Sequence, residues 1–175
     1  MRFKGRGLIT LQDYSSGEIE FILRTAMNFK ERYYAGERII PVLEGRSVCL
    51  IFQKPSTRTR VSFEVAVVQL GGHPISLNWF ELQLGRGETI ADTARVLSKY
   101  VDCIGARVYR HEDIVTLAEY SSVPVVNLLS DKFHPCQALA DLMTILEWKG
   151  RIRGVNVAWV GDGNNVAHSL SLIHI

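Results

Sequence analysis

The sequence predicts an α/β fold in which helices flank a parallel sheet, followed by only the start of a second α/β domain. Short apolar runs of strand composition alternate with longer segments whose apolar residues recur at helical spacing. Such alternation is typical of right-handed βαβ units, whose strands lie parallel. Polar clusters directly follow the predicted strands, as they do where a parallel sheet carries a ligand site.

The first predicted element is a helix that begins after Ser15 and reaches about Tyr34. Ser15 and Glu18 have the spacing of a capping box. Apolar residues at 19, 22, 23, 26 and 27 predict one buried face.

An apolar strand is predicted for 47–52, and a helix follows it and ends at Gly71. We expect the apolar residues at 61, 65, 66 and 70 to form the buried face of this helix. A short second strand is predicted for 73–77.

Residues 78–88 predict a loop whose aromatic side chains we expect to be exposed, and loops of this length are commonly functional or mobile. Beyond it, the pattern predicts a helix over 89–100 with Thr89 as its cap, a strand over 103–108 and a helix over 111–120.

A fourth strand is predicted for 123–127, where Pro124 favours an edge position or the start of the strand. A polar loop then leads into a helix that runs to about Trp148.

The polar stretch 149–154 is the best candidate for a domain boundary. We therefore expect one domain over residues 1–150 and the beginning of an incomplete second domain over 151–175. The second domain should open with an apolar strand over 155–160, followed by a glycine-rich turn and a helix.

Composition excludes several classes of protein. The 175 residues are 47% apolar and 22% charged, and the net charge of +2 predicts no nucleic-acid or membrane surface. Neither a membrane-spanning run nor a signal peptide is visible. Widely spaced cysteines predict reduced thiols in the cytoplasm rather than a disulfide framework; they are Cys49, Cys103 and Cys136.

The run from Ser56 to Arg60, Ser-Thr-Arg-Thr-Arg, lies at the junction between a predicted strand and a predicted helix. A helix N-terminus offers unpaired N–H groups, and hydroxyls and guanidinium groups beside it predict a site for phosphate or another compact oxyanion. No P-loop spacing occurs here. The alternative is an exposed loop, such as a kinase target. We expect Arg60 to pair with Glu64, one helical turn later.

Several stretches resemble the aspartate/ornithine carbamoyltransferase family, in its order and spacing over nearly the whole chain. They are Phe52–Glu64, Gly87–Val96, Ala106–Tyr109, His134–Asp141 and Gly161–Asn165. Within the family the chain is most similar to the ornithine-specific branch, which has glutamine at the position of Gln83 where the aspartate enzymes have lysine. Members are roughly twice as long, so the resemblance implies a carbamoyl-phosphate domain followed by a truncated ornithine domain. We expect such a fragment to be inactive alone.

The resemblance also implies roles for individual residues. Thr59, Arg107 and His134 would polarise the carbamoyl oxygen, Asn165 would bind ornithine, and Gln83 would reach the site of an adjacent subunit in a homotrimer or a multiple of one. The residues implied to bind carbamoyl phosphate are Ser56, Thr57, Arg58, Thr59, Gln83, Arg107, His134, Pro135, Cys136 and Gln137.

The implied reaction carries a carbamoyl group from carbamoyl phosphate to L-ornithine, giving L-citrulline, in arginine biosynthesis or arginine catabolism. It needs neither a cofactor nor a metal, and the spacing of Cys103, His134 and Cys136 does not predict a metal site. Two alternatives stay open. One is another carbamoyltransferase that acts on aspartate, putrescine or an acylated ornithine. The other is a non-catalytic domain that binds carbamoyl phosphate.

Overall fold

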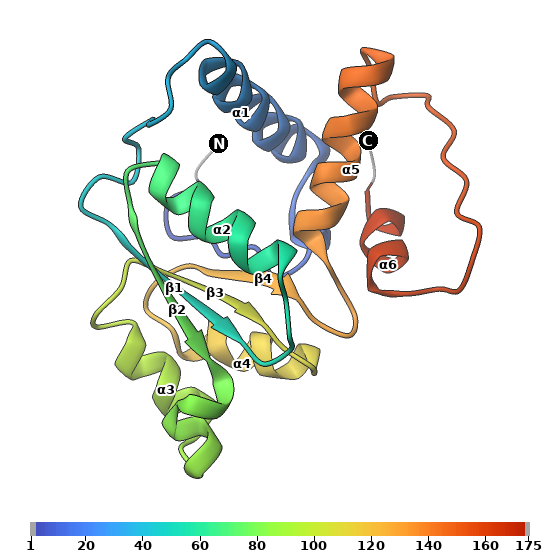
Figure 1. Cartoon of the computed structure of the whole chain (residues 1–175). Helices are drawn as coiled ribbons and strands as arrows, with labels where there is room; N and C mark the ends of the chain where they lie inside the picture. The colour runs from blue at the N-terminus through green and yellow to red at the C-terminus, as the bar shows by residue number, and fades with distance from the viewer. Residues whose placement is uncertain (1–2, 174–175) are drawn as a thin grey trace.

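Four parallel strands form one sheet in the order β2-β1-β3-β4, which confirms the predicted fold class (Figure 1). The computed structural model describes residues 3–173, so residues 1–2 of the first expected domain and 174–175 of the second lie outside it. The strands are β1 Ser47–Phe52, β2 His73–Asn78, β3 Cys103–Arg107 and β4 Val125–Leu129.

Helices lie on both faces of this sheet. In Figure 1, α2 and α5, with α1 packed on α5, lie on one side of the sheet, and α3 and α4 lie on the other. The helices are α1 Ser16–Tyr34, α2 Arg58–Gln69, α3 Ile90–Leu97, α4 His111–Tyr120, α5 Pro135–Lys149 and α6 Asn165–Ser171. Among residues 3–173, no helix has the length and apolar character that crossing a membrane requires.

The core divides at β1 because successive side chains of a strand point to opposite faces. Val48, Leu50 and Phe52 pack toward α2, whereas Cys49 and Ile51 pack toward α3 and α4. All but Val48 are at most 3% exposed, so β1 is buried on both faces, as the central strands of parallel sheets are.

The edge strand β4 is covered by the N-terminal segment. The backbone N–H of Leu8 donates to the carbonyl of Val125, and the N–H of Asn127 donates to the carbonyl of Leu8, both at 2.8 Å. This strand begins two residues later than predicted, after Pro124, and lies at the edge where a proline is tolerated.

The α2 prediction was wrong about which face is buried. Val61 and Val65 are exposed, and the buried residue is Val67, with Phe63 packed beside it against the sheet. The sequence shows where apolar residues recur but not which of them the rest of the molecule covers. In the structure, α2 exposes a stripe of apolar side chains to solvent.

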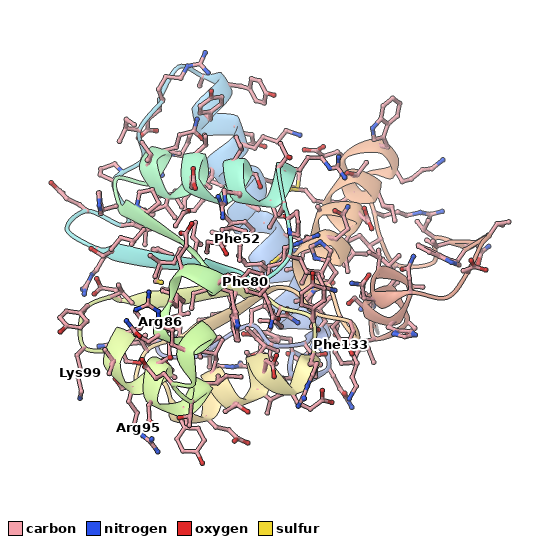
Figure 2. The ribbon with its side chains drawn as sticks, turned by 60° about the horizontal axis from the view of Figure 1, so that its bottom comes forward. Phe52, Phe80, Arg86, Arg95, Lys99 and Phe133 are labelled. Carbon is pink, nitrogen blue, oxygen red and sulfur yellow. The ribbon has the colours of Figure 1, made fainter. Side chains whose placement is uncertain are left out.

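Residues 79–86 are more ordered than a free loop. They form two short 3₁₀ helices, Trp79–Glu81 and Gln83–Arg86, which lie beside α3 (Figure 2 labels Phe80, Arg86 and Arg95 there). Trp79 is only 8% exposed, contrary to expectation, whereas Phe80 is 69% exposed as expected.

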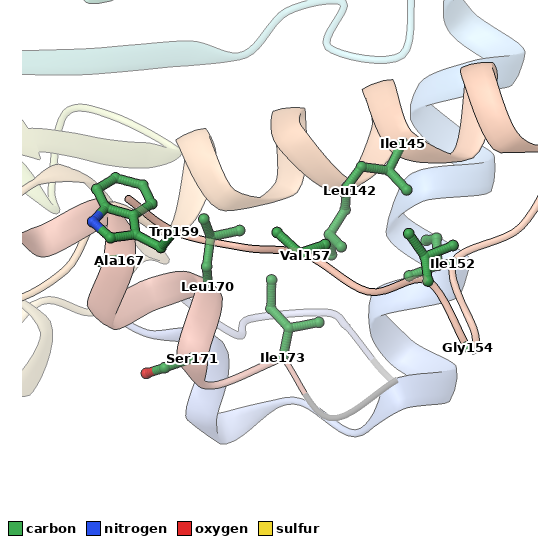
Figure 3. A pocket seen from close by; sticks show the side chains of 11 residues that line it. Leu142, Ile145, Ile152, Gly154, Val157, Trp159, Ala167, Leu170, Ser171 and Ile173 are labelled. Carbon is green, nitrogen blue, oxygen red and sulfur yellow. The ribbon is translucent and has the colours of Figure 1, made fainter. Parts of the chain in front are cut away.

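The strand predicted for 155–160 does not form. These residues are extended and largely exposed, because a strand needs a paired neighbour and none of the described strands lies beside them. The side chains of Val155, Val157 and Trp159 instead help to line an apolar hollow of about 350 Å³ between α5 and α6. Leu142, Val157 and Leu170 lie around this space (Figure 3).

The capping box of α1 gives a test of the fold. Ser15 Oγ accepts from the N–H of Glu18, and the Glu18 carboxylate accepts from the N–H of Ser15. We expect Ser15→Ala to lower the free energy of unfolding by about 1 kcal/mol.

Urea unfolding followed by circular dichroism measures the change. The neighbouring Ser16→Ala is the matched control, because Ser16 is the first helical residue rather than the cap and should leave the free energy nearly unchanged. Equal losses in both variants would contradict the assignment of the cap to Ser15.

Candidate functional site

A cleft of about 480 Å³ opens at the carboxyl ends of the strands, between the N-terminal ends of α2, α5 and α6. In a parallel sheet with helices on both faces, this edge is where ligands bind. The residues that line the cleft are Arg58, Thr59, Ser62, Phe63, Arg107, Leu129, His134, Cys136, Gln137, Ala140, Asn165 and Val166.

Two arginines reach this cleft from different elements. Arg58 is the first residue of α2, and Arg107 is the last residue of β3. Arg107 donates from Nη1 to Thr59 Oγ1 at 3.4 Å, while its buried Nε has no hydrogen-bond partner. Burial and the positive charge of Arg58 lower the pKa of Arg107. In the described part of the chain, neither arginine forms an ion pair with a carboxylate, so the cleft carries uncompensated positive charge.

The sheet is irregular beside Arg107. The register between β3 and β4 shifts after Ala106, so Ala106 pairs with Asn127 but Arg107 pairs with Leu129. The extra residue, Leu128, lies in β4, whereas β3 keeps a regular register with β1 up to Arg107. Bulges of this kind are common beside active sites, and Leu129, which follows this one, lines the cleft.

His134 occupies the N-cap position of α5, immediately before the buried Pro135. Its Nδ1 is buried and has no hydrogen-bond partner. Burial first and the Arg107 charge second lower its pKa to about 4, against a small opposing effect of Asp141. The imidazole is therefore neutral at neutral pH and can donate one hydrogen bond to a ligand atom without adding charge.

Three further predicted residues line the same cleft and already have partners. Gln137 donates from Nε2 to Asp141 at 2.9 Å, and Asn165 donates from Nδ2 to the carbonyl of Ser130 at 2.7 Å. The thiol of Cys136 contacts the carbonyl of Asn127 at 3.5 Å, and burial raises its pKa to about 12, so this thiol is not a nucleophile at neutral pH.

Seven of the predicted residues thus meet in one cleft: Arg58, Thr59, Arg107, His134, Cys136, Gln137 and Asn165. Ser56 and Thr57 lie on the turn before α2, and Pro135 is the first residue of α5, but none of the three is among the described residues that line the cleft. Gln83 is exposed in the second 3₁₀ helix and is not a lining residue of this chain's cleft either.

The predicted pairing of Arg60 with Glu64 does not occur. The Arg60 guanidinium lies over the ring of Phe52, with its carbon 4.6 Å from the ring centroid, and Glu64 accepts a hydrogen bond from Ser76. The buried face of the ring offers Arg60 a stacking partner that helical spacing could not reveal.

Sequence reasoning missed several lining residues. Ser62 and Phe63 lie three and four positions after Thr59, so helical spacing could have placed them beside it. No pattern in the sequence marked Leu129 or Val166. Within residues 3–173, no group of three or more acidic, histidine or cysteine side chains could hold a metal ion. The arginines and helix N-termini around the cleft can recognise a compact anion.

Comparison with known sequences identifies related proteins. Residues 6–147 match the family described as aspartate/ornithine carbamoyltransferase, carbamoyl-P binding domain. The ornithine carbamoyltransferase of Hyperthermus butylicus is 60% identical over 170 residues, which cover 97% of this chain and 54% of that protein. The anabolic ornithine carbamoyltransferase of Pyrococcus furiosus is 63% identical over 168 residues, covering 96% and 53%. This chain therefore spans about half the length of these relatives.

Solved structures show the same architecture. The ornithine carbamoyltransferase from Pyrococcus furiosus superposes with a TM-score of 0.95 at 61% identity, covering 99% of this chain and 55% of that one. Aspartate transcarbamoylase from Trypanosoma cruzi is more distant in sequence, at 29% identity. It still superposes with a TM-score of 0.90 over 98% of this chain and 54% of that one.

The lowered pKa of His134 predicts a pH dependence of stability. The unfolded chain binds a proton at His134 near the ordinary pKa, and the folded chain only near pH 4, so stability should fall as the pH drops from about 6.5 to 4. His134→Gln should remove on the order of 1–3 kcal/mol of this loss. Urea unfolding at pH 7, 5.5 and 4.5 measures it.

Other groups titrate in the same range, including His111, whose pKa burial also lowers. The quantity to compare is therefore the difference between wild type and His134→Gln at each pH. Parallel curves would contradict the buried, neutral state of His134.

Proposed function

The chain belongs to the aspartate/ornithine carbamoyltransferase family, and from that premise we propose that it is the carbamoyl-phosphate-binding part of an ornithine carbamoyltransferase. The proposed reaction transfers the carbamoyl group of carbamoyl phosphate to the side-chain amine of L-ornithine and yields L-citrulline and phosphate. We assign residues 1–150 to this binding domain and 151–175 to the start of the ornithine domain. The family match, which ends at residue 147, supports that boundary.

One observation carries the proposal: two guanidinium groups share the cleft without a carboxylate to balance them. A dianionic phosphate supplies the missing charge, and Arg58 at the start of α2 can donate to it together with the free N–H groups of that helix end. We assign Ser56 and Thr57, on the turn just before α2, to the same phosphate.

The carbamoyl end of the substrate fits the other side of the cleft. When the amine attacks the carbonyl carbon, a C–N bond forms, negative charge develops on the oxygen, and the C–O bond to phosphate then breaks. Arg107, Thr59 and neutral His134 are the donors we assign to that oxygen, as in an oxyanion hole. Gln137 is assigned to the carbamoyl NH₂, from which its Oε1 can accept while its Nε2 keeps donating to Asp141.

The attacking amine must lose a proton, because an ammonium group has no lone pair. None of the described residues that line the cleft has a carboxylate side chain, and His134 is already assigned to the carbamoyl oxygen. We therefore infer that the base is not supplied by residues 3–173 and that this chain alone binds carbamoyl phosphate without turning it over. Asn165 is the one residue here that we assign to ornithine.

The relatives support ornithine over aspartate, since the relatives named here at 60% identity and above are called ornithine carbamoyltransferases, whereas the aspartate enzyme is far more distant. Ornithine-dependent citrulline formation would separate the enzyme from a domain that only binds carbamoyl phosphate. We place the protein in arginine metabolism and, from its three free cysteines, in the cytoplasm.

The working unit that we propose is a homotrimer or a multiple of one, with Gln83 entering a neighbour's cleft. Its support is the exposed apolar surface on one side of the molecule. Val61, Val65 and Val68 form a stripe along α2, and Phe80 is exposed as well. A shallow hollow between α2 and β2 adjoins this stripe. Contiguous exposed apolar surface of this kind is typical of protein interfaces.

Replacing Arg58 tests the phosphate site. Arg58→Ala removes a charge-assisted hydrogen bond worth about 1.5–3 kcal/mol, so the affinity for carbamoyl phosphate should fall roughly 10- to 150-fold in isothermal titration calorimetry. Arg24→Ala, on the exposed face of α1, is the matched control and should bind as wild type does. Unchanged binding by Arg58→Ala would refute the assignment.

Replacing Val65 tests the interface. Val65 is 44% exposed, so Val65→Asp should leave the fold intact but place a charge in the interface and reduce the assembly to monomers. Analytical ultracentrifugation measures the mass of each variant. Val42→Asp introduces the same charge on an exposed valine outside α2 and should leave the assembly unchanged. A wild-type chain that is monomeric at all concentrations would count against the proposal.

A further inference from the structure

Polar contacts join the turn that carries His134 to α6, a helix of the expected second domain. Three residues of α6 contact three residues of the turn. Asn165 Nδ2 donates to the carbonyl of Ser130 at 2.7 Å, and His168 Nδ1 lies 3.0 Å from the carbonyl oxygen of Lys132. The third contact is from the backbone N–H of His134, which donates to Ser169 Oγ at 2.8 Å.

The spacing of these contacts is that of a single helix face. Residues 165, 168 and 169 are separated by three and four positions, so their side chains lie on the same side of α6. The start of the helix is fixed by Asn164, whose side chain accepts from the N–H groups of Val166 and Ala167. The contacting face is therefore held in one orientation.

Ser169 is the most enclosed of the three contacts, with only 1% of its surface exposed. Its hydroxyl donates to the carbonyl of Asn165 and accepts from the N–H of His134, so both its donor and its acceptor roles are used. A buried serine with both roles fulfilled specifies one geometry, because losing either partner leaves a buried polar group unsatisfied.

The other side of the turn is anchored to the first domain. The hydroxyl of Ser130 is buried and lies within hydrogen-bond distance of Asn127, Phe133 and the ring of His111. Figure 2 labels Phe133 in this turn. At the far end of the turn, the carbonyl of His134 accepts from the N–H groups of Gln137 and Ala138 in α5. Its own N–H is held by Ser169, so α5 and α6 together fix the His134 backbone.

We propose that Ser169 is a positioning residue: together with Asn165 and His168 it latches α6 onto the 130–134 turn and thereby sets the place of His134 in the cleft. The role of His134 toward a carbamoyl group rests on the proposed function, whereas the latch itself does not. The latch therefore couples the position of His134, in the first expected domain, to the packing of α6, in the second.

The electrostatic surroundings of His134 make the latch measurable. The charged groups that face it are Arg107 on β3, Arg58 on α2 and Asp141 on its own helix. With the turn held in place, burial and Arg107 keep the imidazole neutral down to about pH 4, so its pKa reports on its position. A turn released from α6 would let water reach the ring and would weaken the desolvation that lowers this pKa.

The experiment follows the histidine ring signals of residues 1–175 by NMR as the pH is lowered, with His134 assigned by the signal that is lost in His134→Gln. Ser169→Ala should move the His134 midpoint upward by roughly one pH unit. Ser169→Thr keeps the hydroxyl and should restore the wild-type midpoint. Ser171→Ala is the matched control on the same helix, because the Ser171 hydroxyl bonds only within α6.

An unmoved midpoint in Ser169→Ala would overturn the latch, and so would an equal rise in Ser169→Thr, since the hydroxyl would then not be responsible. Should Ser169→Ala unfold by circular dichroism, hydrogen exchange of the His134 amide in the wild type decides the matter. Slow exchange supports the latch, and exchange at the unprotected rate refutes it.

A second measurement separates the latch from the proposed function. Calorimetric titration with carbamoyl phosphate should show a several-fold weaker affinity for Ser169→Ala and wild-type affinity for Ser171→Ala. A wild-type chain that does not bind carbamoyl phosphate would refute the proposed function, while the NMR midpoints would still decide whether Ser169 positions His134.

Discussion

The unbalanced positive charge of Arg58 and Arg107 is the constraint on which the rest of the site depends. Two guanidinium groups in one cleft repel each other, and Arg107 pays further for burial, with Nε left without a partner. A fold tolerates such an arrangement where an anionic ligand completes it, and buried groups without partners are often found at functional sites. The cleft is therefore suited to a negatively charged ligand, because its lining residues supply no negative charge of their own.

The scaffold fixes the backbone of both arginines. Arg107 ends a strand in which Ile104 and Ala106 are fully buried. Arg58 begins a helix that packs on the sheet through Val67 and Phe63. The Arg107 side chain is partly buried beside Thr59, whereas that of Arg58 is exposed and can turn toward a ligand in the cleft.

Two of the apolar surfaces that residues 3–173 expose differ in how they are built. The stripe on α2 belongs to one helix beside β2, whereas the hollow between α5 and α6 is also lined by Val155, Val157 and Trp159 of the segment that follows α5. A substitution on α2 therefore leaves the hollow unchanged, so the two surfaces can be tested independently.

The sequence by itself determined the order of strands and helices, the parallel sheet and seven of the cleft residues, because alternating periodicity and turn-borne polar clusters are local properties of the chain. It also located the capping box of α1 and the bounds of β1 and α4. What only the tertiary structure decided depends on contacts between distant segments. Such contacts bury Trp79, expose the stripe of α2, stack Arg60 on Phe52 and leave 155–160 unpaired. They also bring Ser169 to the backbone of His134, 35 residues away in sequence, which no periodicity encodes, because a helix face does not reveal which surface it meets.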